Sequence, residues 1–177
     1  TTVLSLLERA IPLYLSTCGA KDRRTLAAQS LQAQTYQVLG KFDEAERMYV
    51  SVVAIAEQEL DTQDRFTFET RVWQGRNKAL SSAEDAVSFL QNLKTLGTEY
   101  YGPGDILTIM AAGHLAMAYR LEGKVPDAIR EMEEVLATVR SVKVRLDYPI
   151  LNAGFAELVE AYKSIGRSDK AAKVYRE

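Results

Sequence analysis

The chain has 177 residues, of which 47% are hydrophobic and 26% are charged, so it can form either one globular domain or a short array of repeats. Its net charge of -2 argues against sequence-independent binding to nucleic acid, and its single cysteine, Cys18, excludes an internal disulfide. No apolar run approaches the roughly 20 residues that span a bilayer, and we therefore predict a soluble, cytoplasmic protein without a membrane partner.

The first expected element lies within residues 1–20, where apolar residues recur at helical spacing from Val3 to Tyr14. We interpret it as the second helix of an incomplete repeat, and Pro12 predicts that it kinks or ends early. A helical pattern is also under way at Glu177, so we expect the sequence to be part of a longer chain.

The first complete unit covers residues 22–61. Asp22 is expected to cap a helix that Gly40 ends, and Asp43 is expected to cap the next helix. The short turn between the two helices predicts that they pack antiparallel. Ala45 begins the apolar face of the second helix, which continues to Leu60.

The second unit, residues 64–101, is the least regular. Asn77 replaces a tyrosine of the neighbouring units and Ser81 replaces a glycine, so we predict a different internal turn and the lowest stability. The third unit, residues 105–145, is the clearest, and the fourth, residues 147–177, opens with Asp147, Tyr148 and Pro149 and is truncated.

Small and aromatic residues return at a nearly constant distance along the chain. Ala45, Ala86, Ala128 and Ala171 are separated by 41, 42 and 43 residues. Tyr36, Gly40, Ala45 and Tyr49 recur as Tyr119, Gly123, Ala128 and Met132, and again as Tyr162, Gly166, Ala171 and Tyr175. A period of this size predicts stacked helix pairs, because no single pair can bury its apolar face alone.

This pattern resembles the tetratricopeptide repeat (TPR). The period exceeds the roughly 34 residues of the standard repeat, and Asp-x-x-Thr followed by Leu, Phe or Ile recurs from Asp22, Asp64 and Asp105. Both features are similar to the longer repeats of kinesin light chains and of related microbial signalling ATPases. The resemblance implies an all-α, right-handed superhelical solenoid of antiparallel helix pairs, with residues 1–177 forming one repeat domain.

One feature of kinesin light chains is missing from the sequence. These proteins resemble one another in paired asparagines that hold cargo peptides, and none of the matching pairs here is Asn-Asn. The matching pairs are Ser30-Leu31, Arg71-Val72, Gly113-His114 and Ala156-Glu157. Neither the peptide clamp nor a motor-cargo role is therefore expected of this chain.

The sequence offers little catalytic chemistry. His114 is the single histidine, and it has no companion ligands or nucleophile in a recognisable pattern. The absence of a phosphate loop or zinc motif also favours a protein that is not an enzyme and uses no metal or cofactor. Glu131, Glu133 and Glu134 are interpreted as a solvated helix face.

The candidate binding site lies on the first helix of each unit, which lines the concave groove in the TPR family. The candidate residues are Gln37, Arg71, Lys78, His114, Met117, Arg120, Glu160 and Lys163. Gln37, Lys78, Arg120 and Lys163 each follow a signature tyrosine position, and three of the four are basic. The alternative is that these cations simply suit helix C-termini.

We therefore predict a protein-protein interaction module, a scaffold that receives a peptide or partner protein in the groove and favours acidic segments. Two other functions stay open. The chain could be a ligand-sensing or autoinhibitory region of a larger signalling ATPase, or a module for self-association through apolar repeat surfaces.

Overall fold

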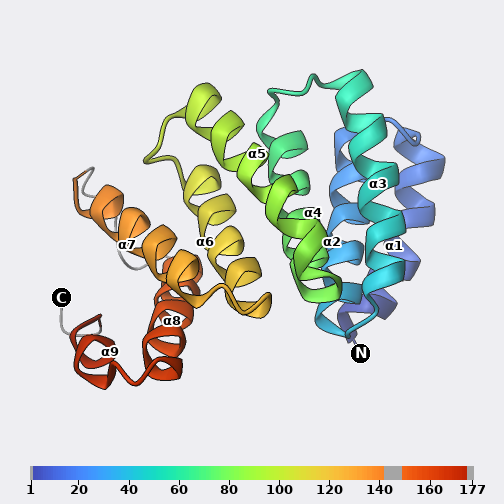
Figure 1. Cartoon of the computed structure of the whole chain (residues 1–177). Coiled ribbons are helices and arrows are strands. Elements are labelled where there is room, and N and C mark those ends of the chain that lie inside the picture. The colour runs from blue at the N-terminus through green and yellow to red at the C-terminus, as the bar shows by residue number, and fades with distance from the viewer. Residues whose placement is uncertain (1, 142–148, 175–177) are drawn as a thin grey trace. The chain divides into compact units, whose positions relative to one another are not determined.

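The computed structural model describes residues 2–141 and 149–174, and the elements within these ranges are helices joined by short turns. The chain divides into two compact units, each larger than one repeat. From here on, the first unit means residues 1–81 and the second unit means residues 82–177 (Figure 1). Asp147, Tyr148 and Tyr175 lie outside the described residues. The predicted all-α class is confirmed for the described part of the chain.

The first unit contains four helices: α1 (Thr2–Cys18), α2 (Arg23–Val38), α3 (Phe42–Glu59) and α4 (Arg65–Ser81). Each helix packs against the next, and α4 also packs against α2, as a stack of helical pairs requires. Leu26, Ala45, Tyr49, Val52 and Ala56 form the centre of this packing and are no more than 1% exposed. The predicted antiparallel pairing of α2 and α3 follows from their three-residue connection.

The second unit contains α5 (Ala83–Tyr101), α6 (Ile106–Leu121), α7 (Val125–Ser141), α8 (Pro149–Ser164) and α9 (Ser168–Val174). Helix α6 packs against α5, α7 and α8, and this central place explains why most of its side chains are buried. Its core with α7 and α8 includes Ala112, Ala116, Met132, Val135 and Leu158. The first helices of successive repeats, α6 and α8, therefore lie next to each other.

Three turns end helices in the same way, and each uses a signature glycine. Gly40, Gly123 and Gly166 have φ angles of 73°, 84° and 73°. At the first turn, the Gly40 N–H donates to the carbonyl of Gln37 (3.1 Å) and the Lys41 N–H donates to that of Tyr36 (2.9 Å). This is the Schellman arrangement, which requires the left-handed conformation that glycine adopts without strain.

The recurring aspartates are helix caps. The carboxylates of Asp22, Asp64 and Asp105 each accept the backbone N–H two residues later, at 2.9 Å. The prediction for Asp43 is wrong, because α3 already begins at Phe42 with Lys41 as its N-cap residue. The Ala45 N–H donates to the Lys41 carbonyl at 3.0 Å, so Asp43 lies in the first turn, where its charge suits the helix dipole.

The capping carboxylate of Asp22 should titrate at an unusually low pH. The side-chain hydrogen bond from Arg24, followed by the backbone hydrogen bond from the same residue, lowers the pKa of Asp22 to about 2. Since the ordinary pKa is 3.8, this carboxylate stabilises the fold above that pH and loses its contribution as the pH falls through about 2. An NMR titration of Asp22 measures the pKa directly, and Arg24→Ala should raise it. A value near 3.8 in the unaltered chain would contradict this account.

The sequence is irregular at Pro12 and at the turn that follows Ser81, and the structure differs from the prediction only at Pro12. Helix α1 continues through Pro12 to Cys18, so the predicted early end is wrong; the helix simply proceeds for another turn and a half beyond the missing hydrogen-bond donor. Ser82 alone connects α4 to α5, in an extended conformation, so the predicted difference at this turn is confirmed. Asn77 is fully buried, and its amide donates to the Phe42 carbonyl (3.0 Å) and to Glu46 (3.2 Å).

Candidate protein-binding surfaces

The predicted site residues of the first unit are engaged within that unit. Gln37 is 3% exposed; its amide accepts from Arg76 at 2.5 Å and donates to the Trp73 carbonyl at 3.3 Å. Lys78 Nζ lies 2.7 Å from Glu46 Oε1 on α3, and Arg71 Nη1 lies 3.5 Å from Glu57 Oε1. Gln37 thus joins α2 to α4 rather than facing a partner, because its amide satisfies polar groups that the packing buries.

The second unit places three predicted residues on one face. His114 and Met117 are each 8% exposed, so they contribute to the packing of α6. Lys163 Nζ lies 2.8 Å from Glu160 Oε1 on the exposed side of α8. The hydrogen bond and the charge of Lys163, with a smaller effect of Arg120 on α6, lower the pKa of Glu160. Helices α6 and α8 pack against each other, and Arg120 and Lys163 each lie in the last turn of their helix. We call the surface formed by Arg120, Glu160 and Lys163 the α6/α8 face.

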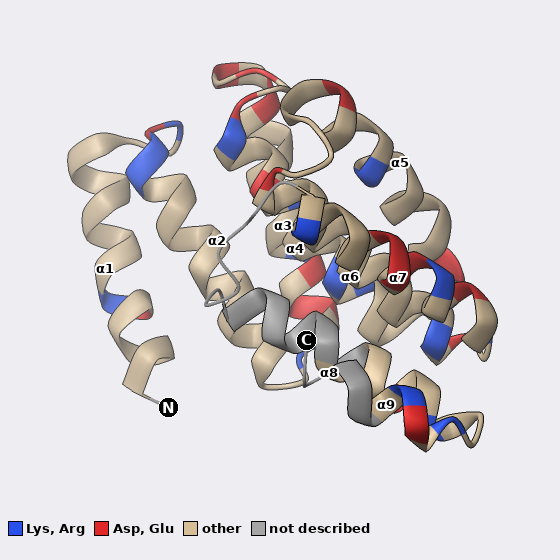
Figure 2. Cartoon of the chain, turned by 90° about the vertical axis from the view of Figure 1, so that its left-hand side faces the viewer, with Lys and Arg blue, Asp and Glu red and all other residues tan. Residues whose placement is uncertain are grey.

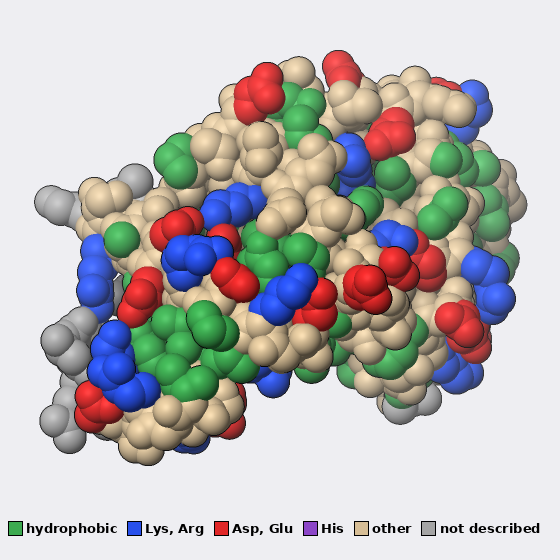
Figure 3. Space-filling view, viewed as in Figure 1, with side chains coloured by type: hydrophobic (Ala, Val, Ile, Leu, Met, Phe, Trp, Pro, Cys, Tyr) green, Lys and Arg blue, Asp and Glu red, His purple; other side chains and the backbone are tan. Residues whose placement is uncertain are grey.

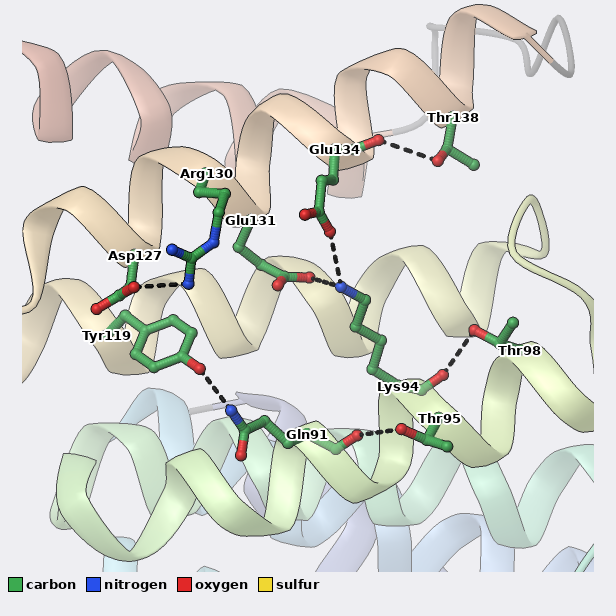
Figure 4. Close-up of polar contacts among 10 residues, drawn as sticks. All are labelled: Gln91, Lys94, Thr95, Thr98, Tyr119, Asp127, Arg130, Glu131, Glu134 and Thr138. Carbon is green, nitrogen blue, oxygen red and sulfur yellow. Dashed lines mark hydrogen bonds and ion pairs between the residues drawn. The ribbon is translucent and has the colours of Figure 1, made fainter.

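The structure also contains a groove that the sequence analysis did not identify. It has a volume of about 730 Å³ and lies between α5 and α7, with α6 beneath it. Figure 4 shows side chains of α5 and α7 pointing toward each other across this space. The lining residues of this α5/α7 groove are Gln91, Lys94, Thr95, Thr98, Glu99, Leu115, Tyr119, Arg130, Glu131 and Glu134.

Lys94 bridges the two walls of the groove. Its ammonium lies 2.5 Å from Glu131 Oε1 and 3.2 Å from Glu134 Oε2, both on α7. Burial by itself would lower the pKa of Lys94, but its hydrogen bonds and charge interactions with the two glutamates outweigh burial and raise the pKa above 10.5. Lys94 is therefore protonated at neutral pH and ties α5 to α7.

The floor of the groove combines an apolar surface with one hydrogen bond. Leu115 and Tyr119 come from α6 and are 2% and 9% exposed. Gln91 Nε2 donates to the Tyr119 hydroxyl at 2.6 Å, which fixes a wall side chain to the floor (Figure 4). Helix α5 presents Gln91, Lys94, Thr95 and Thr98 on one face because they are spaced by three or four residues.

The acidic residues of α7 are not simply a solvated face. Glu131 is 8% exposed and is paired with Lys94, whereas Glu133 accepts a hydrogen bond from the Tyr162 hydroxyl and lies 3.7 Å from Lys170. The interpretation as a solvated helix face is therefore wrong for Glu131, because the packing of α7 near α5 buries that side chain. Figure 2 shows basic and acidic residues interspersed along α7 rather than gathered by sign.

Two general properties bear on function. In the described part of the chain, no helix is long and apolar enough to cross a membrane. The same residues include no group of three or more His, Cys, Asp or Glu side chains that could hold a metal ion.

The helix pairs, their glycine turns and their buried small residues define a helical-repeat fold of the TPR type. Residues 25–64 match the family model of the tetratricopeptide repeat. The match spans α2, its turn and α3, so the predicted repeat is confirmed there by sequence as well as by structure. A comparison with curated proteins finds no match.

Solved structures share the fold. One is a protein of Podosopora anserina that is assigned as a kinesin light chain and whose own TPR-like repeats are nearly identical to one another. This chain is similar to it with a TM-score of 0.70 and 24% sequence identity, over 98% of this chain and 82% of that chain. A point variant of that protein gives a TM-score of 0.72 with the same identity and coverage. BtubC (BKLC) from P. vanneervenii gives 0.71 with 19% identity over 96% and 68% of the two chains. The predicted kinesin-light-chain-like TPR fold is thus confirmed.

Proposed function

We propose that this chain is a protein-interaction module that binds an acidic segment of a partner protein on the α6/α8 face. TPR folds generally serve as protein-interaction modules, and this chain has that fold. The observation that carries the proposal is the position of Arg120, Glu160 and Lys163, two cations and one carboxylate on first helices that pack against each other. Arg120 and Lys163 can each donate charged hydrogen bonds to carboxylates of a partner.

The α6/α8 face is the better part of the predicted site for this role. Lys163 and Glu160 have side chains that are 56% and 60% exposed, so a partner can reach both. In the first unit, Lys78 is 29% exposed and is held by Glu46, and Gln37 is buried. The proposal therefore assigns recognition to Arg120 and Lys163 and treats Arg71 and Lys78 as residues that stabilise α4 against α3.

Reversing the charge of the α6/α8 face should weaken binding of an acidic peptide. For the double variant Arg120→Glu and Lys163→Glu, we expect affinity for a fluorescein-labelled peptide of glutamate and leucine to fall about tenfold, or about 1.4 kcal/mol. Binding to the unaltered chain should also weaken as salt rises, because dissolved ions screen the attraction between the peptide and these cations. Fluorescence anisotropy at two salt concentrations measures both effects.

The matched control is the double variant Arg9→Glu and Arg47→Glu. It makes the same change in net charge at two exposed positions of the first unit. The control should bind the acidic peptide as the unaltered chain does. Equal weakening by the two double variants would refute recognition at the α6/α8 face and leave only a general effect of net charge.

Self-association remains the second candidate function, and one observation favours it. On α1, the side chains of Val3, Leu6 and Leu13 are 50%, 55% and 66% exposed, although they are apolar. Repeat surfaces of this kind are stable when another helix covers them. A role as the sensor region of a signalling ATPase stays a prediction.

A further inference from the structure

We propose that the α5/α7 groove is a second docking site, which binds a basic segment of a partner protein through its arginine or lysine side chains. The groove is built by α5, α6 and α7 and shares none of the three residues of the α6/α8 face. Its charge preference is also opposite, so this site and the proposed acidic-segment site can be tested separately.

The balance of charge in the groove favours a cation. Its lining includes the carboxylates of Glu99, Glu131 and Glu134 and the cations of Lys94 and Arg130. Arg130 is already paired with Asp127, since Arg130 Nη2 lies 2.6 Å from Asp127 Oδ1. With Asp127 included, the carboxylates outnumber the cations by two, which leaves a net negative field over the groove.

The carboxylates at the rim can be reached. The side chain of Glu134 is 59% exposed and shares the single ammonium of Lys94 with Glu131. Glu99 is exposed and forms no ion pair with any described residue. An incoming guanidinium can therefore pair with either glutamate without first displacing Lys94, and such pairs are the strongest of the common charged hydrogen bonds.

The uncharged wall of α5 also suits a side chain that only donates hydrogen bonds. The Thr95 hydroxyl donates to the Gln91 carbonyl at 3.1 Å, and the Thr98 hydroxyl donates to the Lys94 carbonyl at 2.8 Å. Each hydroxyl therefore offers its lone pairs as acceptors. The amide of Gln91 donates to Tyr119, which leaves its carbonyl oxygen as an acceptor too. Arginine and lysine carry donors and no acceptors, so they complement this wall.

The groove has a place for the apolar stem of the same side chains. Leu115 and the Tyr119 ring form its floor, and the volume of about 730 Å³ is that of a side-chain site rather than of a whole folded partner. Figure 3 shows hydrophobic side chains surrounded by both kinds of charge on this face of the second unit. A lysine or arginine stem can lie on such a floor while its charged end reaches the rim.

The test uses a fluorescein-labelled peptide of arginine and leucine as the probe, with the glutamate and leucine peptide for comparison. The arginine peptide should shift the NMR amide signals of residues 91–99 and 130–134. The double variant Glu99→Lys and Glu134→Lys should weaken its binding about tenfold, because both reachable carboxylates become repulsive.

The control variant is Glu8→Lys with Glu69→Lys, which makes the same change in net charge at exposed positions of α1 and α4. It should leave binding of the arginine peptide unchanged, and circular dichroism should show that both double variants are folded. Equal weakening by both variants, or amide shifts that avoid α5 and α7, would overturn the proposal. If only the α6/α8 proposal is wrong, the arginine peptide should still shift the amide signals of residues 91–99 and 130–134. The two proposals can therefore be refuted independently.

Discussion

Replacing Phe68 by alanine is expected to lower the free energy of unfolding by about 3 to 5 kcal/mol. Phe68 follows the capping aspartate of α4 and is completely buried in the first unit. Its truncation removes most of an aromatic side chain and leaves a cavity that packed helices can close only in part. The equivalent positions Leu26 and Ile109 are buried as well, so this residue fills a recurring place in the repeat.

Urea unfolding followed by circular dichroism measures the Phe68→Ala loss. Phe66→Ala is the matched control, because it removes the same atoms from the same helix turn. The Phe66 side chain is half-buried, with the Arg23 guanidinium 5.6 Å from its ring centroid, so its truncation should cost distinctly less. Equal losses would show that the motif position has no special role in the core.

Enlarging Ala128 to leucine should cost about 1 to 3 kcal/mol, the second largest effect we expect. Ala128 is 2% exposed near the start of α7, and Ala45 and Ala86 at the same repeat position are completely buried. Helix α7 packs against α6 and α8, so a buried position on it has little room for a larger side chain. Three additional carbon atoms force either the helices or the neighbouring side chains to move.

Ala137→Leu provides the control for this substitution, since Ala137 lies on the same helix but is exposed. It should change the unfolding free energy by less than about 0.5 kcal/mol. Thermal or urea unfolding of the two variants gives the comparison. If Ala128→Leu unfolded at the same urea concentration as Ala137→Leu, the repeat register based on the alanines would be wrong.

Much of the helical framework could be predicted because its signals are local. Asp22, Asp64 and Asp105 cap helices through atoms two residues away, and Gly40, Gly123 and Gly166 end helices through their own φ angles. The prediction that Asp43 caps α3 was wrong by two residues, because an aspartate in the first turn of a helix and one at its N-cap look alike in sequence. The early end expected at Pro12 was wrong because one missing donor did not stop the helix.

The candidate site could be predicted only in part. Arg120, Glu160 and Lys163 share a face because the repeat brings equivalent turns of α6 and α8 together, which the period of the sequence indicates. Gln37 was expected to be accessible, yet Arg76 and Trp73 engage it inside the first unit. The α5/α7 groove was not predicted, because both of its walls are second helices of their pairs, whereas the predicted site lies on the first helices. One signal was present: Lys94 and Glu134 are 40 residues apart, nearly one repeat.

By itself, the sequence determined that this chain is built of helical repeats and where most helices begin and end, because caps, turns and small residues act within a few residues or recur at a fixed period. Only the tertiary structure decided which polar side chains are buried between packed helices and which are exposed at the surface. Gln37 and Glu131 lie on helices whose polar faces look alike in sequence, and both are buried when a neighbouring helix packs over them. Their burial depends on helices far along the chain, since Gln37 accepts a hydrogen bond from Arg76, 39 residues away, and Glu131 on α7 pairs with Lys94 on α5.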